Sequence, residues 1–371
     1  MVVIISADLL CVSEELHQAL ASALPELGPN SIFLAGTHTH SSYGGFFHSS
    51  ATEKMLGAPN KEIFDFLVQK LAGLAKLALS DLSAARASTG SGKVLGLVSS
   101  RRQADGPHDD RLVLLRLERK GRKPIDLVCV SGHPVIVVEK EINTISGDYP
   151  GEFCRSLEAQ GSRPVFLSAG LGGASILFPE FDMDLERHMS LAVGLLSEGY
   201  RQALASCKPL ALNDSNALNV EFTHLSHAPH QCRFFSGLGA VGKFADALVS
   251  PLRNSLAKKM SRALPLKKGI PLHFIRLGDF LLLGSANELG ISVILAIREI
   301  ARQHSLPVPM VASLVDGYAG YIHLSNIYKL WPEKGYRFLA FYENGLAMFG
   351  YDLGDQIARA AGAWIEKNMS D

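Results

Sequence analysis

The chain has 371 residues, of which 47% are hydrophobic and 19% charged, and its 36 basic residues balance 36 acidic ones. This length and composition allow a large hydrophobic core in one α/β domain or two closely joined ones. The balanced charge argues against an electrostatic nucleic-acid binder. No apolar run reaches the ~18 residues that a membrane span needs.

Five cysteines are scattered along the chain without a CxxC spacing. An odd number of isolated thiols favours a reducing compartment over a disulfide framework. No signal peptide is apparent, so we expect a cytoplasmic protein. The first expected strand begins directly after Met1, which is compatible with an incomplete N-terminus.

Strands and helices are expected to alternate along the chain. Short apolar runs predict strands at 2–6, 31–35, 94–98, 112–117, 125–130, 165–168, 218–222, 272–277, 280–283 and 310–315. Amphipathic stretches predict helices after the N-cap Ser13 and at 61–79, 150–160, 184–205, 288–303 and 355–367. We therefore predict an α/β fold with mixed β-sheet layers flanked by helices. The chain is expected to form a single domain, 1–371, with 206–271 as the place for a subdomain or insertion.

A Thr-His-Thr-His motif follows the expected strand at 31–35 and carries His38 and His40. In an extended chain, residues two apart point to the same side, so both imidazoles are expected to face one pocket at the end of a strand. Neutral imidazole is the commonest metal ligand in proteins, and it also serves as an acid or base. The motif therefore indicates a metal or acid–base site, with two surface histidines as the alternative.

Other expected strands also end in polar side chains. Asp8, His133, Glu288 and the glycine-rich 168–175 loop occupy such positions, and 316–321 follows the strand at 310–315. Convergence of such groups at strand ends is what an active site on an α/β sheet requires. Taken alone, Glu288 is interpreted as a residue in the first turn of a helix.

Seven blocks of the sequence carry a more specific signal: VVIISADLL, LAGTHTHSSYGGFF, SSRRQADGPHDDRLVLLRL, GHPVIVVEKEINTISGDYPGEF, LSAGLGGASILFP, GSANELG and DGYAGYIHLSNIY. In this order they resemble the blocks of the neutral/alkaline (non-lysosomal) ceramidase family, from Val2 to about Gly350. The resemblance implies a ceramidase-type catalytic domain without the immunoglobulin-like C-terminal domain that ceramidases carry.

The resemblance also implies the site residues. His38, His133, Glu288 and Tyr321 would bind Zn²⁺. His40, Arg101, Ser175 and Tyr328 would be catalytic or would contact the substrate, and Tyr336 is a weaker match to a pocket tyrosine. Two imidazoles and a carboxylate are a common catalytic zinc set. Asp8 or Asp148 could orient a histidine ligand as a hydrogen-bond acceptor.

The expected function is a zinc-dependent hydrolase that cleaves an N-acyl amide bond with metal-activated water. Its substrate would be a small-molecule or lipid-like N-acyl compound, with no nucleic acid and no transmembrane segment involved. Whether Ser175 attacks or only binds is left open, as is the oligomeric state.

The sequence departs from the family pattern at several positions around these residues. Gly173 stands where the family has an Asp, Ser100 where it has an Asn, and Ala286-Asn287 where it has Pro-Gly. A catalytically degenerate, ceramidase-like ligand-binding protein is therefore one alternative. An amidohydrolase-type metallohydrolase, which also places an HxH after an early strand, is the other, but no regular eightfold βα pattern supports it.

Overall fold

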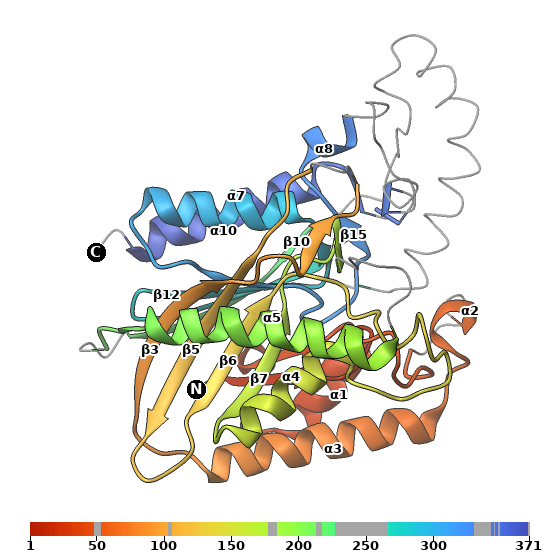
Figure 1. Cartoon of the computed structure of the whole chain (residues 1–371), viewed down its shortest axis with the longest axis horizontal. Coiled ribbons are helices and arrows are strands. Elements are labelled where there is room, and N and C mark those ends of the chain that lie inside the picture. Colours follow the sequence, from red (N-terminus) through yellow and green to blue (C-terminus); the bar gives the residue numbers. More distant parts are fainter. Residues whose placement is uncertain are drawn as a thin grey trace.

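A computed structural model shows a four-layer α/β fold in which two β-sheets pack face to face and helices cover their outer faces (Figure 1). The structure describes residues 1–47, 53–102, 106–176, 184–212, 217–226, 266, 268–329, 343–344, 346–347 and 349–369. The mixed α/β architecture with sheets flanked by helices, predicted from the sequence, is confirmed. Most of 206–271, where a subdomain or insertion was expected, lies outside the described residues.

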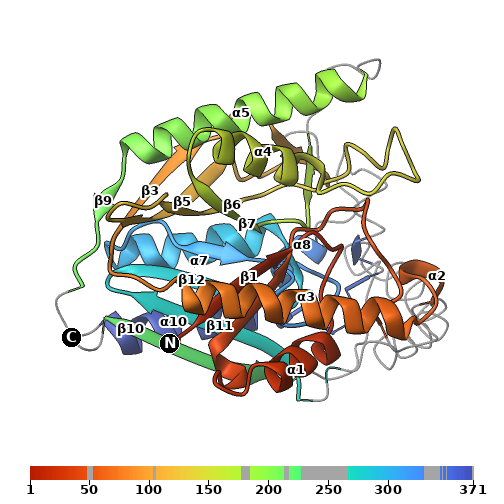
Figure 2. The same ribbon diagram turned by 90° about the horizontal axis from the view of Figure 1, so that it is seen from below.

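The first sheet has five strands in the order β7-β6-β5-β3-β9. Their bounds are β3 Ala85–Lys93, β5 Arg111–Arg119, β6 Ile125–Val130, β7 Arg163–Ser168 and β9 Lys208–Pro209. Helices α4 (Asp148–Ala159) and α5 (Leu185–Ala205) cover its outer face (Figure 2). Side chains alternate between the two faces of a strand. In β5, Leu112 and Leu114 accordingly pack towards these helices, whereas Val113 and Leu115 face the second sheet.

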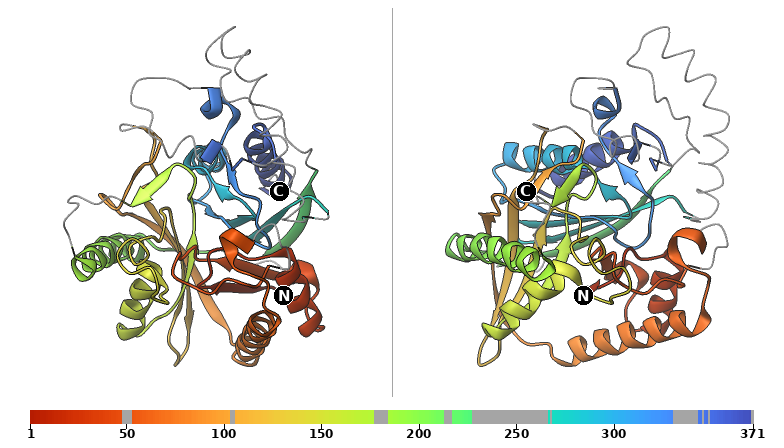
Figure 3. Two further views of the ribbon diagram at one scale, coloured as in Figure 1. Left: turned by 90° about the vertical axis from the view of Figure 1, so that its right-hand side faces the viewer. Right: turned by 45° about the vertical axis from the view of Figure 1, so that its right-hand side comes forward.

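The second sheet has four strands in the order β10-β11-β12-β14. Their bounds are β10 Leu218–Leu225, β11 Ile270–Leu277, β12 Phe280–Ser285 and β14 Met310–Ala312. Helices α7 (Ile291–Gln303) and α10 (Leu353–Met369) pack on its outer face, on the opposite side of the molecule from α5 (Figure 3). Leu282 and Ile275 face the first sheet, so a central apolar layer joins the two sheets.

The remaining helices and strands complete the fold around this sandwich. They are β1 Val3–Ala7, α1 Glu14–Ala23, the 3₁₀ turn Pro29–Ser31, β2 Ile32–Gly36, α2 Glu53–Leu56, α3 Lys61–Ser80, β4 Val98–Ser100, β8 Ala174–Ile176, β13 Glu288–Leu289, β15 Tyr321–Ile322 and α8 Ser325–Lys329. Three two-stranded pairs, β1-β2, β4-β8 and β13-β15, lie outside the two large sheets. Two of these pairs carry residues of the predicted site.

Most predicted elements are present, and several are wrong in position. Ser13 caps α1 as predicted, since its side chain accepts a hydrogen bond from the backbone N–H of Leu16. The strand predicted at 94–98 is wrong because β3 ends at Lys93 and β4 begins at Val98, with a turn between them. The helix predicted from residue 288 begins at Ile291, because Glu288 belongs to the short strand β13.

The apolar stripe predicted to bury α3 against a sheet is only partly buried. Leu67 and Leu71 lie in the core, but Phe66, Leu74 and Leu77 are 47%, 60% and 66% exposed. No helix in the described part of the chain is long and apolar enough to cross a membrane.

Candidate metal and active site

Loops at the ends of several strands bring the predicted site residues together. His38 follows β2, His133 follows β6, and Glu288 in β13 pairs directly with Tyr321 in β15. All four side chains are buried, with His38 2%, His133 1%, Glu288 2% and Tyr321 4% exposed. Residues distant in the sequence thus form one cluster where the strands end, as the sequence pattern predicted.

Backbone carbonyls fix the orientation of both buried histidines. The Nδ1 of His38 lies 2.7 Å from the carbonyl of Leu10, and the Nδ1 of His133 lies 3.1 Å from the carbonyl of Ala174. A carbonyl oxygen can only accept a hydrogen bond, so each Nδ1 carries the proton in the neutral ring. Each Nε2 therefore presents a lone pair, which is the form that binds a metal ion.

Asp8 and Asp148 do not orient these histidines, so that prediction is wrong. The Asp8 carboxylate accepts a hydrogen bond from the Thr37 hydroxyl, and the Asp148 carboxylate accepts from the backbone of Val137 and Tyr149. The carbonyls of Leu10 and Ala174, and not these carboxylates, accept the hydrogen bonds that orient the two histidines. No side-chain pattern in the sequence could have identified a backbone acceptor.

The backbone at His38 explains how its ring reaches the cluster. The φ angle of His38 is 68°, in the left-handed region that non-glycine residues rarely adopt. The motif is therefore not extended, and the predicted reason for His38 and His40 facing one pocket is wrong. The two rings nevertheless meet edge to face at 4.9 Å, with His38 buried and His40 exposed. Backbone strain of this kind is common at functional sites.

Glu288 completes the cluster. Its Oε2 lies 3.2 Å from the Nε2 of His38 and 3.4 Å from the Nε2 of His133. The hydroxyl of Tyr318 donates a 2.8 Å hydrogen bond to Oε1 of Glu288, and the hydroxyl of Tyr321 lies 3.1 Å from the Nε2 of His133. Tyr318 was not predicted. It lies three residues before Tyr321 in the block that indicated Tyr321.

Two imidazole lone pairs and a carboxylate oxygen therefore point at one another in a buried place. The Nε2 of His38 and the Oε2 of Glu288 make no hydrogen bond within the part of the chain that the structure describes. Unsatisfied buried polar atoms are costly, and a cation between these two atoms would satisfy both. The ring nitrogens of His38, His40 and His133 also lie within 4.8 Å of one another. The residues present thus fit a metal ion.

Charges around the cluster set the pKa values of its members. Burial would raise the pKa of Glu288, but His38 and His133 outweigh it and hold the pKa well below the usual range. Burial, followed by Arg101, lowers the pKa of His133 to about 3. The protein around the His40 ring excludes part of its solvent and, with His38 and His133 nearby, lowers the pKa of His40 as well. The Glu288 carboxylate is thus ionised and the imidazoles of His133 and His40 are neutral near pH 7, the forms in which such groups bind a metal ion.

Arg101 and Ser175 lie beside the histidines. The Arg101 Nη1 is 3.2 Å from the Nε2 of His133, and its Nε is 3.3 Å from the Oγ of Ser175. The pairing of β4 with β8 sets this geometry, because Ser99 pairs with Ser175 and the Arg101 N–H donates to the carbonyl of Gly173. The structure thus brings a cation, a hydroxyl and His40 to the edge of the cluster.

The predicted pocket tyrosines are less closely associated with the cluster. The hydroxyl of Tyr328 accepts a hydrogen bond from the backbone N–H of His323, and its ring stacks on Tyr351 at 4.2 Å. Tyr336 lies outside the described residues.

Sequence reasoning also missed a buried charged group next to Arg101. It consists of Arg102, His323, Glu343 and Asn344. Glu343 and Asn344 are isolated polar residues in a segment without a motif, so the sequence carries no signal for them.

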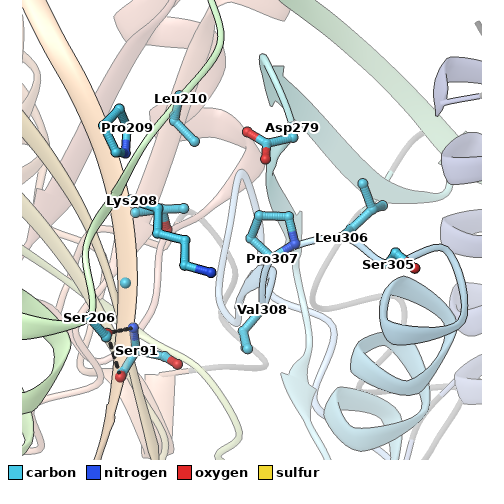
Figure 4. A pocket seen from close by; sticks show the side chains of 12 residues that line it. Ser91, Ser206, Lys208, Pro209, Leu210, Asp279, Ser305, Leu306, Pro307 and Val308 are labelled. Carbon is cyan, nitrogen blue, oxygen red and sulfur yellow. Dashed lines mark hydrogen bonds between the residues drawn. The ribbon is translucent and has the colours of Figure 1, made fainter.

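A separate cavity of about 430 Å³ lies at the other end of the second sheet (Figure 4). Lys208 and Asp279 are among the side chains on its walls. Asp279 precedes β12 and Glu288 follows it, so about 20 Å of strand separates this cavity from the histidines. It is not part of the candidate site.

The fold and the cluster together define a class: an α/β protein with a buried group of histidines that could bind a metal ion. Within that class, the fold is that of neutral ceramidases. The structure superposes on "neutral ceramidase from Pseudomonas aeruginosa" with a TM-score of 0.74 and 17% sequence identity, covering 99% of this chain and 66% of that one. It is equally similar to a "ceramidase complexed with C2", with a TM-score of 0.74, 16% identity and 99% and 68% coverage.

These similarities confirm the fold that the sequence resemblance implied. The chain spans about two-thirds of the length of these ceramidases. No protein-family model matches the sequence, and no curated protein matches it.

Proposed function

We propose that this protein is a zinc-dependent hydrolase that cleaves an N-acyl amide bond. His38, His133 and Glu288 would hold the metal, with Tyr321 beside them. The observation that carries the proposal is the convergence of two imidazole lone pairs and an ionised carboxylate on one buried point. The ceramidase fold supports an amide as the substrate.

Zinc in such a donor set polarises an amide carbonyl and makes water acidic enough to be a nucleophile near pH 7. The other roles belong to the side chains at the edge of the cluster. His40 is exposed and its ring lies against the rings of His38 and His133, so it is placed to transfer a proton to the leaving amine. Arg101 is a fixed cation that can stabilise negative charge developing on the substrate oxygen.

Ser175 fits a binding role better than that of a nucleophile. Its Oγ lies against the Nε of Arg101, a group that donates and cannot take up the hydroxyl proton. A nucleophilic serine needs an adjacent base. We therefore assign Ser175 to substrate binding alongside Arg101.

The proposal is tested first by elemental mass spectrometry on purified protein, beside a His38→Ala/Glu288→Ala double variant. We expect close to one zinc per chain in the wild type and loss of the metal in the variant. Turnover is then measured on N-acyl amides that range from short soluble amides to ceramide. No bound metal after zinc is supplied would refute the hydrolase. Stoichiometric zinc without turnover would instead identify a ligand-binding protein with a ceramidase fold.

A further inference from the structure

Glu343 lies at the centre of the buried charged group beside the candidate site. Its side chain is fully buried, and its Oε1 accepts a 2.8 Å hydrogen bond from the backbone N–H of Gly173. Its Oε2 lies 3.1 Å from Arg102 Nη1 and 3.1 Å from His323 Nε2. One carboxylate therefore joins three segments that are far apart in the sequence.

The same carboxylate reaches Arg101. The distance from Oε1 of Glu343 to Nη1 of Arg101 is 3.8 Å, and this Nη1 is the atom that lies 3.2 Å from His133. Arg101 and Arg102 are only 8% and 7% exposed, so two neighbouring cations are largely removed from water. A buried charge is tolerated when it is paired.

Glu343 is ionised in this environment. Burial would raise its pKa, but His323, Arg102 and Arg101 outweigh burial and lower the pKa to about 2.

The contact of Glu343 with Gly173 matters as much as the charge of Glu343. Gly173 precedes β8, and the Gly173 carbonyl accepts the Arg101 N–H. Glu343 thus contacts both the guanidinium of Arg101 and the strand that carries Ser175.

We propose that Glu343 is a positioning residue that holds Arg101 and the start of β8 in the geometry in which Arg101 contacts both His133 and Ser175. The effect on catalysis rests on the proposed function, whereas the restraint on Arg101 does not. Glu343 itself does not touch the reacting atoms. Its carboxylate acts through Arg101 and through the Gly173 backbone.

Gly173 offers a way to move this carboxylate. A Cβ at position 173 would lie 3.4 Å from the His323 ring and 3.6 Å from the Cδ of Arg102, which are ordinary contacts. The φ of Gly173 is +77°, a conformation that Asp tolerates better than most residues. An Asp at 173 would therefore bring a carboxylate next to Arg102 and His323, two of the partners of Glu343, but not to Arg101.

The test is the rate at which phenylglyoxal modifies each arginine, followed by peptide mass spectrometry on wild type, Glu343→Gln and Glu343→Gln/Gly173→Asp. In the Glu343→Gln variant we expect Arg101 to be modified at least fivefold faster. Arg119 is an internal control, because it is equally buried and pairs with Asp81 instead. Its rate should not change. The double variant restores a negative charge beside Arg102 but not beside Arg101, so Arg101 should stay reactive in it.

Unchanged protection of Arg101 in Glu343→Gln, or full protection of Arg101 in the double variant, would overturn the proposal. If Arg119 also becomes reactive, the substitution has loosened the whole fold. The Glu343→Asp variant then tests whether Glu343 restrains Arg101. That variant keeps the charge but retracts it by one methylene, so Arg101 should react faster while Arg119 does not. Wild-type protection of Arg101 in this variant would contradict a positioning role for Glu343.

Zinc content and kinetics measured on the same samples keep this proposal separate from the proposed function. We expect Glu343→Gln to retain zinc and to raise the KM for an N-acyl amide about tenfold, with no recovery of kcat/KM in the double variant. A wild type without zinc or turnover would refute the hydrolase while leaving the result for Arg101 intact.

Discussion

Tyr318 donates a 2.8 Å hydrogen bond to Oε1 of Glu288, and Oε2 of the same carboxylate faces His38 and His133. The phenol thus fixes which oxygen is directed at the imidazoles. Groups that orient metal ligands contribute to metal affinity although they do not touch the ion.

Tyr318→Phe should therefore weaken zinc binding by about 10- to 100-fold, because Glu288 loses the partner that fixes its rotation. Competition with a chromogenic chelator measures the change. Tyr200→Phe is the matched control, since its hydroxyl also bonds a buried carboxylate, that of Asp126, in the first sheet. Equal zinc affinities in the two variants would show that Tyr318 does not orient a ligand.

The His40→Ala variant distinguishes a catalytic role for His40 from a role as a metal ligand. If His38, His133 and Glu288 hold the metal, the variant should retain zinc and lose about 100- to 10,000-fold in kcat, the usual contribution of a general acid or base. Zinc content and kcat are measured on the same preparation. Loss of zinc from His40→Ala would instead identify His40 as a metal ligand. The geometry also permits this role, because a ring nitrogen of His40 lies within 4.8 Å of ring nitrogens of His38 and His133.

Much of the site could be predicted because its residues occur in short motifs at strand ends. His38, His133 and Glu288 were indicated in this way and Tyr321 by the resemblance to ceramidases, and the structure brings all four together. The groups that orient them could not be predicted. Leu10 and Ala174 act through backbone carbonyls, and Glu343 comes from a segment without a motif.

Strand β3 was not predicted from the sequence, and the physical reason is different. Its sequence, ARASTGSGK, lacks the alternation of apolar residues that indicates a strand. Gly90 and Gly92 are needed because α5 packs against them, and a Cβ at either position would lie 2.2 Å or 2.0 Å from a backbone carbonyl of that helix. Close packing of a helix on the strand thus removed the side chains from which the strand would have been recognised.

Ser175→Ala should leave measurable turnover. Loss of one hydrogen bond to a charged group costs roughly 1.5–3 kcal/mol, so we expect kcat/KM to fall by about 10- to 100-fold. Removal of a catalytic nucleophile costs far more, about a millionfold in a serine protease. Steady-state kinetics distinguish these outcomes, and a pre-steady-state burst with a trapped acyl-enzyme in the wild type would contradict the binding role.

Asp81 joins the end of α3 to the first sheet. Its carboxylate accepts hydrogen bonds from Arg119 at 2.6 Å, from Arg163 at 2.8 Å and from Arg122. The hydrogen bond from Arg119 is the main cause of a pKa below the usual 3.8. The folded state therefore favours the ionised form, and the carboxylate stabilises the protein above pH 3.8 but loses this effect as the pH falls through its lowered pKa.

Asp81→Asn should accordingly lower the melting temperature at pH 7, and the difference from wild type should shrink as the pH falls below about 4. Thermal unfolding followed by circular dichroism at a series of pH values measures both effects. Asp65→Asn is the control, because its carboxylate pairs with the exposed Lys61 on the same helix, an arrangement that contributes little. A difference that stays constant from pH 7 to pH 3 would show that the three arginines do not act through the charge of Asp81.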